Sequence, residues 1–188
     1  MTSQATRRVI AGLVLVMSSV VAAAIRAGPA EPQDYRIDQY RAPTPETISG
    51  GVPLDTPAAR HLWKDGGAVW IDVLAAPHRP ADLPSSAVWL PVPRRDIPGS
   101  LWLPDVGRGE LNAKLEVYFR ANLEQATKDR RDVKVVFYCL ANCWMSWNAA
   151  KRAISWGYTR IYWYRDGTDG WEAAKLPLAR ATPLPGYR

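Results

Sequence analysis

Histidine is scarce in this chain of 188 residues, and long basic runs are missing. The only two histidines, His61 and His78, have no metal-binding or catalytic motif around them, so we expect both on the surface. A zinc site would need further ligands that the sequence does not supply. The net charge is +6, but no run of lysine or arginine exceeds two residues, which argues against a nucleic-acid surface. The sequence therefore predicts no metal, no cofactor and no nucleic-acid partner.

The N-terminus is strongly apolar. After Arg7 and Arg8, a run that is apolar except for one glycine and two serines extends from Val9 to Ile25. A basic start followed by an apolar run and small residues is typical of a secretory signal peptide. The run is slightly shorter than the roughly 20 apolar residues that a membrane-spanning helix needs. We expect residues 1–27 to be a signal peptide or, alternatively, an uncleaved anchor, the only part that contacts a membrane. Either case predicts an exported, periplasmic protein.

The remaining chain has the composition of one folded domain. Apolar residues make up 47% of the sequence and charged residues 22%, which allows a buried core and argues against disorder. A second full domain does not fit the length, because single domains peak at roughly 100–150 residues. Residues 28–52 hold many prolines and few periodic apolar positions, so we expect a proline-rich arm there. The domain is expected to occupy residues 53–183.

Strand-like and helix-like patterns alternate along the domain. Strands are expected at residues 68–73, 133–138 and 160–164, with a possible edge strand at 88–90 and a turn followed by a short strand at 97–104. Helices are expected at residues 58–64, 111–128 and 147–154. In the second helix, Leu115, Phe119 and Leu123 recur every four residues and form one buried stripe. This alternation predicts an α/β fold with a central parallel sheet of about five strands and helices on both faces.

The only two cysteines, Cys139 and Cys143, lie between an expected strand and an expected helix. Ligands bind at the carboxyl ends of parallel strands, where the next helix presents free N–H groups and the positive end of its dipole. A thiolate at Cys139 is favoured there, so we expect the pKa of its thiol to lie below the usual value. Cys139 is therefore a candidate nucleophile that needs no histidine base.

The cysteine pair has other possible roles besides a nucleophile. A structural disulfide is the alternative, because exported proteins often oxidise paired thiols. A bond within so short a loop closes little chain and stabilises the fold only weakly, which favours a reversible bond. Covalent haem attachment requires a histidine after the second cysteine, where this chain has Trp144. We interpret Cys143 as a thiol that resolves products formed on Cys139.

Seven segments resemble the rhodanese-like domain superfamily between about Pro53 and Pro177. They are VWIDV and IPGSLWLP in the first half and VVFYC, NAAKRA, WGY, IYWY and DGTDGW in the second. The resemblance implies that Cys139 carries a persulfide sulfur between a donor and a thiophilic acceptor. We expect Asp72, at the end of its strand, to orient loop groups by hydrogen bonds. The expected substrate-binding loop consists of Leu140, Ala141, Asn142, Trp144, Met145 and Ser146.

A narrower resemblance concerns the cysteine loop and the arm. YCLANCWMSWNAAKRA, DGTDGW and the arm segment YRIDQYRAPTPETISGG are similar to exported CxxCW-motif proteins associated with catabolism that depends on pyrroloquinoline quinone. Three residues separate the cysteines here, so the motif's name does not fit literally. The resemblance implies quinoprotein alcohol oxidation as the context. The partners it implies are a small sulfur donor or acceptor or a protein thiol, together with a quinoprotein dehydrogenase or cytochrome.

The loop departs from the common rhodanese pattern. Asn142 and Trp144 stand where many rhodaneses have glycine and then arginine, and the loop is one residue longer. A missing arginine predicts weaker recognition of thiosulfate. The first functional hypothesis is therefore an enzyme of the sulfur-relay or thiol-redox type. The alternative is a non-catalytic binding or assembly protein whose surface displays some of the nine tryptophans. A phosphatase ranks third because the loop lacks an anion clamp.

Residues around the loop give further expectations. Trp144 and Trp147 lie three apart at a helix start, where we expect them to pack on the sheet instead of lining a pocket. Lys151 and Arg152 are expected to face solvent. Residues 166–171, rich in aspartate and glycine, are expected to shape a turn.

Overall fold

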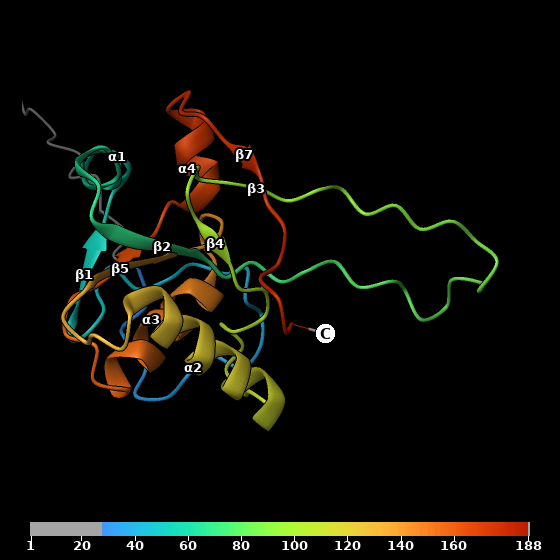
Figure 1. Cartoon of the computed structure of the whole chain (residues 1–188), viewed down its shortest axis with the longest axis horizontal. Coiled ribbons are helices and arrows are strands. Elements are labelled where there is room, and N and C mark those ends of the chain that lie inside the picture. The colour runs from blue at the N-terminus through green and yellow to red at the C-terminus, as the bar shows by residue number, and fades with distance from the viewer. Residues whose placement is uncertain (1–27, 188) are drawn as a thin grey trace, which may run out of the picture.

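A central sheet of five parallel strands organises the computed structural model, which describes residues 28–187 (Figure 1). The order across the sheet is β1, β6, β5, β2, β4, and each neighbouring pair is parallel. These strands are β1 (Gly51–Leu54), β2 (Ala68–Asp72), β4 (Leu101–Trp102), β5 (Lys134–Tyr138) and β6 (Ile161–Tyr164). A small antiparallel sheet pairs β3 (Arg95–Asp96) with β7 (Ala179–Arg180). The predicted α/β fold with a five-stranded parallel sheet is confirmed.

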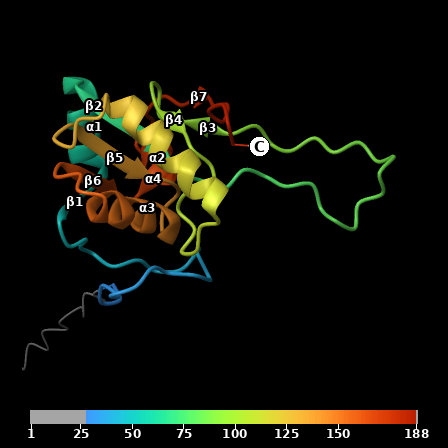
Figure 2. The same cartoon turned by 60° about the horizontal axis from the view of Figure 1, so that its bottom comes forward.

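Helices cover both faces of this sheet, as predicted. They are α1 (Thr56–Asp65), α2 (Ala113–Thr127), α3 (Trp144–Ser155) and α4 (Gly167–Ala173). Strand β5 lies in the middle of the sheet and sends alternate side chains to two hydrophobic clusters. Val135 and Phe137 join the cluster beneath α2 and α3, whereas Val136 and Tyr138 join Trp171 and the cluster beneath α1 and α4. Figure 1 shows α1 and α4 above the strands and α2 and α3 below them, and Figure 2 brings α2 and α3 to the front.

Local signals fix the helix ends. The Asp55 side chain accepts a hydrogen bond from the Ala58 backbone N–H and caps α1, which begins at Thr56, two residues before the expected start. Gly66 ends this helix with a positive φ of 71°. Helix α2 lies within its expected range, and Phe119 and Leu123 are fully buried as predicted.

Three expected elements differ from the structure. Residues 88–90 form no strand and instead belong to a long connection, residues 73–94, that projects from the body of the domain (Figure 1). Helix α3 begins at Trp144 instead of Trp147, because the Trp144 backbone N–H is satisfied by the Tyr40 carbonyl. The expected turn after β6 is helix α4, whose N-cap residue Asp166 also accepts hydrogen bonds from Thr56.

The arm packs along α3 and contributes to the domain. The Trp144 and Trp147 ring N–H groups donate to the carbonyls of Pro43 and Thr47, at 3.1 and 3.2 Å. Lys151 donates to the Pro32 carbonyl at 2.9 Å instead of facing solvent only. Strand β1 begins at Gly51, so the sheet takes in two residues that the sequence analysis assigned to the arm.

Arg152 contradicts its expected exposure to solvent. The residue is buried, and its guanidinium donates to the carbonyls of Val106, Arg108 and Gly109 while stacking on the Tyr35 ring. These carbonyls belong to the loop before α2, so Arg152 fastens that loop to α3. Pattern alone placed the arginine on the solvent face of the helix, because the loop and the arm that cover it come from distant parts of the chain.

The predicted signal peptide or anchor, residues 1–27, lies outside the described residues. Within residues 28–187, no helix combines the length and the apolar character needed to cross a bilayer.

Asn148 offers a test of how the arm is held. Its buried side-chain amide accepts from the Arg36 backbone N–H at 3.0 Å and donates to the carbonyls of Arg36 and Gly107 at 2.8 and 3.0 Å. Asn148→Ala leaves these backbone groups unpaired, so we expect the free energy of unfolding to fall by about 2–4 kcal/mol in urea titrations. Asn122→Ala, which removes one bond to the Tyr118 carbonyl on half-exposed α2, should cost less than about 1 kcal/mol. Equal losses in the two variants would contradict this packing.

Candidate active site

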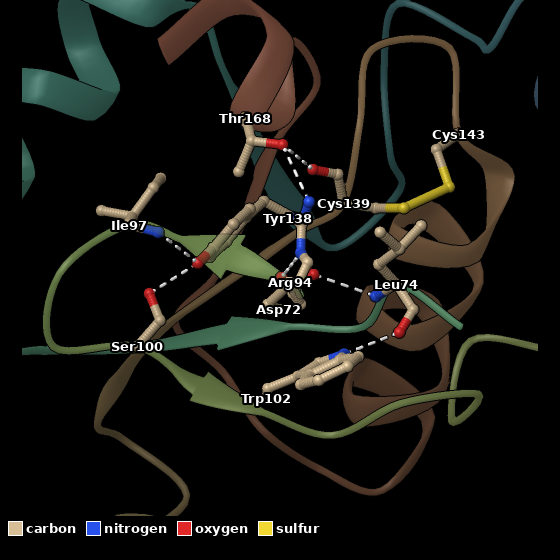
Figure 3. Close-up of polar contacts among 10 residues, drawn as sticks. All are labelled: Asp72, Leu74, Arg94, Ile97, Ser100, Trp102, Tyr138, Cys139, Cys143 and Thr168. Carbon is tan, nitrogen blue, oxygen red and sulfur yellow. Dashed lines mark hydrogen bonds and ion pairs between the residues drawn. A yellow bond between two sulfur atoms is a disulfide. The ribbon is translucent and has the colours of Figure 1, made fainter. Parts of the chain in front are cut away.

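Cys139 and Cys143 lie where β5 ends and α3 begins. Cys139 directly follows the central strand, and Cys143 is the N-cap residue of α3. A disulfide joins the two residues, which are 0% and 2% exposed (Figure 3). The loop between them consists of Leu140, Ala141 and Asn142, and Asn142 takes a left-handed φ of 52°. The expected position of the cysteines at the carboxyl edge of the sheet is therefore the observed one.

Helix α4 holds one side of the loop. The Thr168 backbone N–H donates to the Cys139 carbonyl at 3.0 Å, and the Ala141 N–H donates to the Asp169 carboxylate at 3.1 Å. Gly167 forms a bridge with Leu140, and its φ of 54° suits glycine. A Cβ at Gly167 would lie 2.5 Å from the Cys139 carbonyl oxygen, so the close approach also requires glycine. These contacts fix the backbone on the Cys139 side.

The arm holds the other side of the loop. Arg41 forms an isolated antiparallel bridge with Cys143, and the Tyr40 carbonyl accepts from the Trp144 N–H at 2.9 Å. The Arg41 guanidinium also lies 3.8 Å from the Asp169 carboxylate. The arm and α4 thus meet across the loop, and the arm occupies the first backbone donor of α3. An anion at this helix end would have to compete with the Tyr40 carbonyl.

A buried ion pair between Asp72 and Arg94 lies next to the cysteine loop. Asp72, at the end of β2, accepts from the Arg94 Nε at 2.6 Å and from the Leu74 backbone N–H at 2.9 Å. The Arg94 Nη1 donates to the Thr168 hydroxyl at 3.2 Å, and the same threonine binds the Cys139 carbonyl (Figure 3). Asp72 thus acts on the loop through Arg94 and Thr168, and the described structure gives it no direct bond to the loop. Arg94 was missed by sequence reasoning; the one signal for it was the need of a buried aspartate for a cation.

Burial governs the acidic groups around this ion pair. It raises the pKa of Asp72, and Arg94 opposes that rise. Burial and the neighbouring Asp72 charge raise the pKa of Asp96 to about 7, although the Arg94 charge lowers it. Burial raises the pKa of Tyr138 well above its usual value, and its hydroxyl accepts from the Ile97 N–H and donates to Ser100. Asp96 therefore titrates near neutral pH.

The remaining expected loop residues belong to α3. Trp144, Met145 and Ser146 form its first turn and are 4%, 4% and 1% exposed, so the non-helical part of the loop ends at Cys143. Ser146 donates to the Cys143 carbonyl and accepts from the Trp163 ring N–H. Trp144 packs edge-on against Trp147, and both belong to the hydrophobic cluster beside the sheet, as expected. Trp144 also lines a shallow pocket with residues of the arm.

The arrangement suits thiol–disulfide chemistry. The N-terminus of a helix stabilises a thiolate, and Cys143 occupies that position on α3. An attack on the Cys139 sulfur would therefore release a stabilised leaving group. No cluster of three or more histidine, cysteine, aspartate or glutamate side chains suited to a metal occurs in residues 28–187. His61 and His78 are exposed, as expected, and pair with Asp65 and Asp105.

Asp96 predicts a pH-dependent stability. The folded protein holds a proton on Asp96 up to about pH 7, whereas the unfolded chain releases it near pH 4. The free energy of unfolding should therefore fall as pH rises between these values, by at most roughly 4 kcal/mol. Asp96→Asn should match the wild type at pH 4 and exceed it at pH 8, as measured by urea unfolding across pH. Parallel curves for the two proteins would contradict the raised pKa.

The fold of this chain is similar to those of known proteins. Solved structures with similar folds include a thiosulfate sulfurtransferase from Pseudomonas aeruginosa (18% identity, 71% of this chain and 21% of that one, TM-score 0.47). Another is the polysulfide-sulfur transferase homodimer from Wolinella succinogenes (19% identity, 71% of this chain and 82% of that one, TM-score 0.44). A third is a human single-domain sulfurtransferase (24% identity, 64% of this chain and 95% of that one, TM-score 0.40). The chain thus spans about a fifth of the Pseudomonas protein. No curated protein matches it. The rhodanese-like domain family matches residues 58–174, and the chain therefore belongs to that family.

Proposed function

We propose that the protein transfers or reduces sulfane sulfur through Cys139, with Cys143 as the resolving thiol. The observation that carries this proposal is the disulfide between the residue that ends β5 and the N-cap residue of α3. Membership of the rhodanese-like family supports a sulfurtransferase-like reaction. A structural disulfide would need only proximity, whereas this one joins the family's nucleophile position to a position that stabilises a thiolate.

The reaction begins from the reduced pair. The Cys139 thiolate attacks the outer sulfur of a donor such as a persulfide, the donor's S–S bond breaks, and the donor thiolate leaves with the electron pair. Cys139 then carries a persulfide. The Cys143 thiolate attacks the Cys139 Sγ, forms the disulfide and releases hydrosulfide. The cysteine pair loses two electrons and the sulfane sulfur gains them. A low-molecular-weight thiol or a protein dithiol then restores the reduced pair.

Access and charge shape the choice of donor. Both cysteines are buried, so a donor reaches Cys139 only when the half-buried Leu140 and Ala141 move aside. The loop carries no arginine, and the buried Arg94 already pairs with Asp72. We therefore propose that thiosulfate, a small dianion that needs a free cationic clamp, is a poor donor.

The tryptophans give no support to the alternative of a purely binding protein. All nine lie within the described residues and none is exposed; Trp70, Trp102, Trp144, Trp147, Trp163 and Trp171 are buried. Seven of the nine, all except Trp89 and Trp102, belong to the two clusters that flank the sheet. The observation that motivated an aromatic docking surface is therefore accounted for by packing.

Single cysteine variants test the chemistry. Reduced Cys143→Ser protein mixed with an organic persulfide should gain one sulfur atom on Cys139 and keep it, because the resolving thiol is missing. The wild type should form the disulfide and release hydrosulfide, and Cys139→Ser should do neither. Intact-protein and peptide mass spectrometry measure these products. If Cys139 gains no sulfur in Cys143→Ser and the wild type forms no disulfide, the proposal is wrong.

We further propose that the protein works outside the cytoplasm in a quinoprotein-dependent alcohol catabolism, with a quinoprotein dehydrogenase or cytochrome as its partner system. The support is the resemblance of the N-terminal segment to a signal peptide and of the loop and arm to the CxxCW-motif proteins. The disulfide also fits an oxidising compartment.

Fractionation of cells that make the tagged full chain tests the location. The protein should appear in the periplasm, or in the membrane fraction if residues 1–27 stay attached, and external protease should reach it after the outer membrane is opened. A periplasmic and a cytoplasmic marker protein serve as controls. Recovery with the cytoplasmic marker alone would refute export.

A further inference from the structure

A cavity lies beside the cysteine loop, between α4 and the long connection of residues 73–94. Its volume is about 670 Å³, a size typical of sites for organic molecules, and it exceeds what thiosulfate needs. Its apolar walls include Leu74, Trp89, Pro91, Trp102, Leu140 and Leu178. We call it the Trp89 cavity. Two of these residues place it next to the disulfide: Leu140 follows Cys139 in sequence, and Leu74 packs on the cluster that includes both cysteines.

The long connection builds the outer wall of the Trp89 cavity. Val88 and Leu90 are 82% and 86% exposed and lie outside the cavity lining, whereas Trp89 and Pro91 are half-buried and line the cavity. Trp89, Pro77 and His78 also line a second, neighbouring cavity. The indole is therefore accessible to a flat apolar group.

One residue that lines the Trp89 cavity, Arg94, has an unsatisfied donor. The Arg94 side chain lines the cavity and is only 10% exposed. Its Nε and Nη1 donate to Asp72 and Thr168, but its Nη2 is buried without a hydrogen-bond partner in the described part of the chain. A buried guanidinium N–H without a partner is costly, and an oxygen supplied by a ligand would satisfy it.

Three further charged residues line the Trp89 cavity. Arg95 adds a second cation, and Asp169 and Glu172 add two carboxylates on the α4 side. Asp169 is occupied, since it accepts from the Ala141 N–H and lies near Arg41. Figure 3 shows Arg94 between Asp72 and Thr168.

We propose that the Trp89 cavity binds an organic sulfur compound that has an apolar, ring-sized body and an oxygen acceptor for Arg94. The body contacts Trp89 and the surrounding apolar walls, and the sulfur reaches Cys139 past Leu140. This assignment rests on the proposed function, because it names the substrate class of the same reactive pair. Substrate choice then lies in the long connection as much as in the cysteine loop.

Phenylmethanethiosulfonate illustrates the chemistry. The Cys139 thiolate attacks the terminal sulfur of this donor, the donor's S–S bond breaks, and phenylmethanesulfinate leaves with the electron pair, so that Cys139 carries a persulfide. The Cys143 thiolate then attacks the Cys139 Sγ, forms the disulfide and releases hydrosulfide. A thiol reductant returns two electrons to the pair.

Calorimetric titration of the oxidised protein with phenylmethanesulfonate, which carries no reactive sulfur, tests the site without any reaction. Methanesulfonate has the same head without the ring and should bind at least about tenfold more weakly. Trp89→Ala should lower the affinity for phenylmethanesulfonate at least about tenfold and leave the methanesulfonate affinity unchanged. Leu90→Ala, on the same segment but outside the cavity lining, is the matched control and should bind as the wild type does.

Arg94→Lys tests the unsatisfied donor of Arg94. It keeps a cation for Asp72 but removes the planar donor set, so both sulfonates should bind more weakly. Circular dichroism checks that this variant folds; if it does not, the Trp89→Ala and ring comparisons decide alone. Equal affinity for the two sulfonates, absence of binding, or no effect of Trp89→Ala would each overturn the assignment. Such a result would leave the cysteine chemistry intact, and sulfonate binding without any cysteine reaction would refute the proposed function alone.

Discussion

The buried ion pair between Asp72 and Arg94 is the interaction on which the functional end of the molecule depends. A carboxylate placed at the fully buried end of a central strand requires a cation, and this chain supplies it from 22 residues further along. The long connection must therefore leave β2 and return to the same point. Its return fixes Arg94 against Thr168, and Thr168 holds the Cys139 carbonyl. One pair thus sets the backbone of the reactive loop and one wall of the neighbouring cavity.

A second constraint comes from the two elements that meet across the loop. The N-terminal residues of α4 bind the backbone at Cys139 and Ala141, while the arm binds it at Cys143 and Trp144. Two of the three residues between the cysteines are held as well, because Leu140 bridges Gly167 and the Ala141 N–H donates to Asp169. The disulfide can therefore open and close with little change elsewhere, because the ends of the loop are held by groups that do not depend on the sulfur atoms.

Local patterns predicted the parts of the protein that local forces determine. The apolar run of β5, the stripe of α2 and the cysteines between strand and helix were all readable, because burial and periodicity leave clear marks in the sequence. Arg94 and Arg152 were not readable. Each lies among other polar residues, and each becomes buried only because distant segments supply Asp72 or the carbonyls of the loop before α2. The start of α3 was misplaced for the same reason, since its first N–H bonds to the arm.

The arm is synthesised before the helix on which it packs. Its partners Asn148 and Lys151 lie 112 and 119 residues downstream of Arg36 and Pro32. Contacts so distant in sequence form slowly, because a large loop must close before they stabilise anything. The segment that leaves the ribosome before the rest of the domain therefore docks only after α3 exists. Until then Trp144 and Trp147 lack the carbonyls that later bind them, and the newly made domain exposes the helix end that carries Cys143.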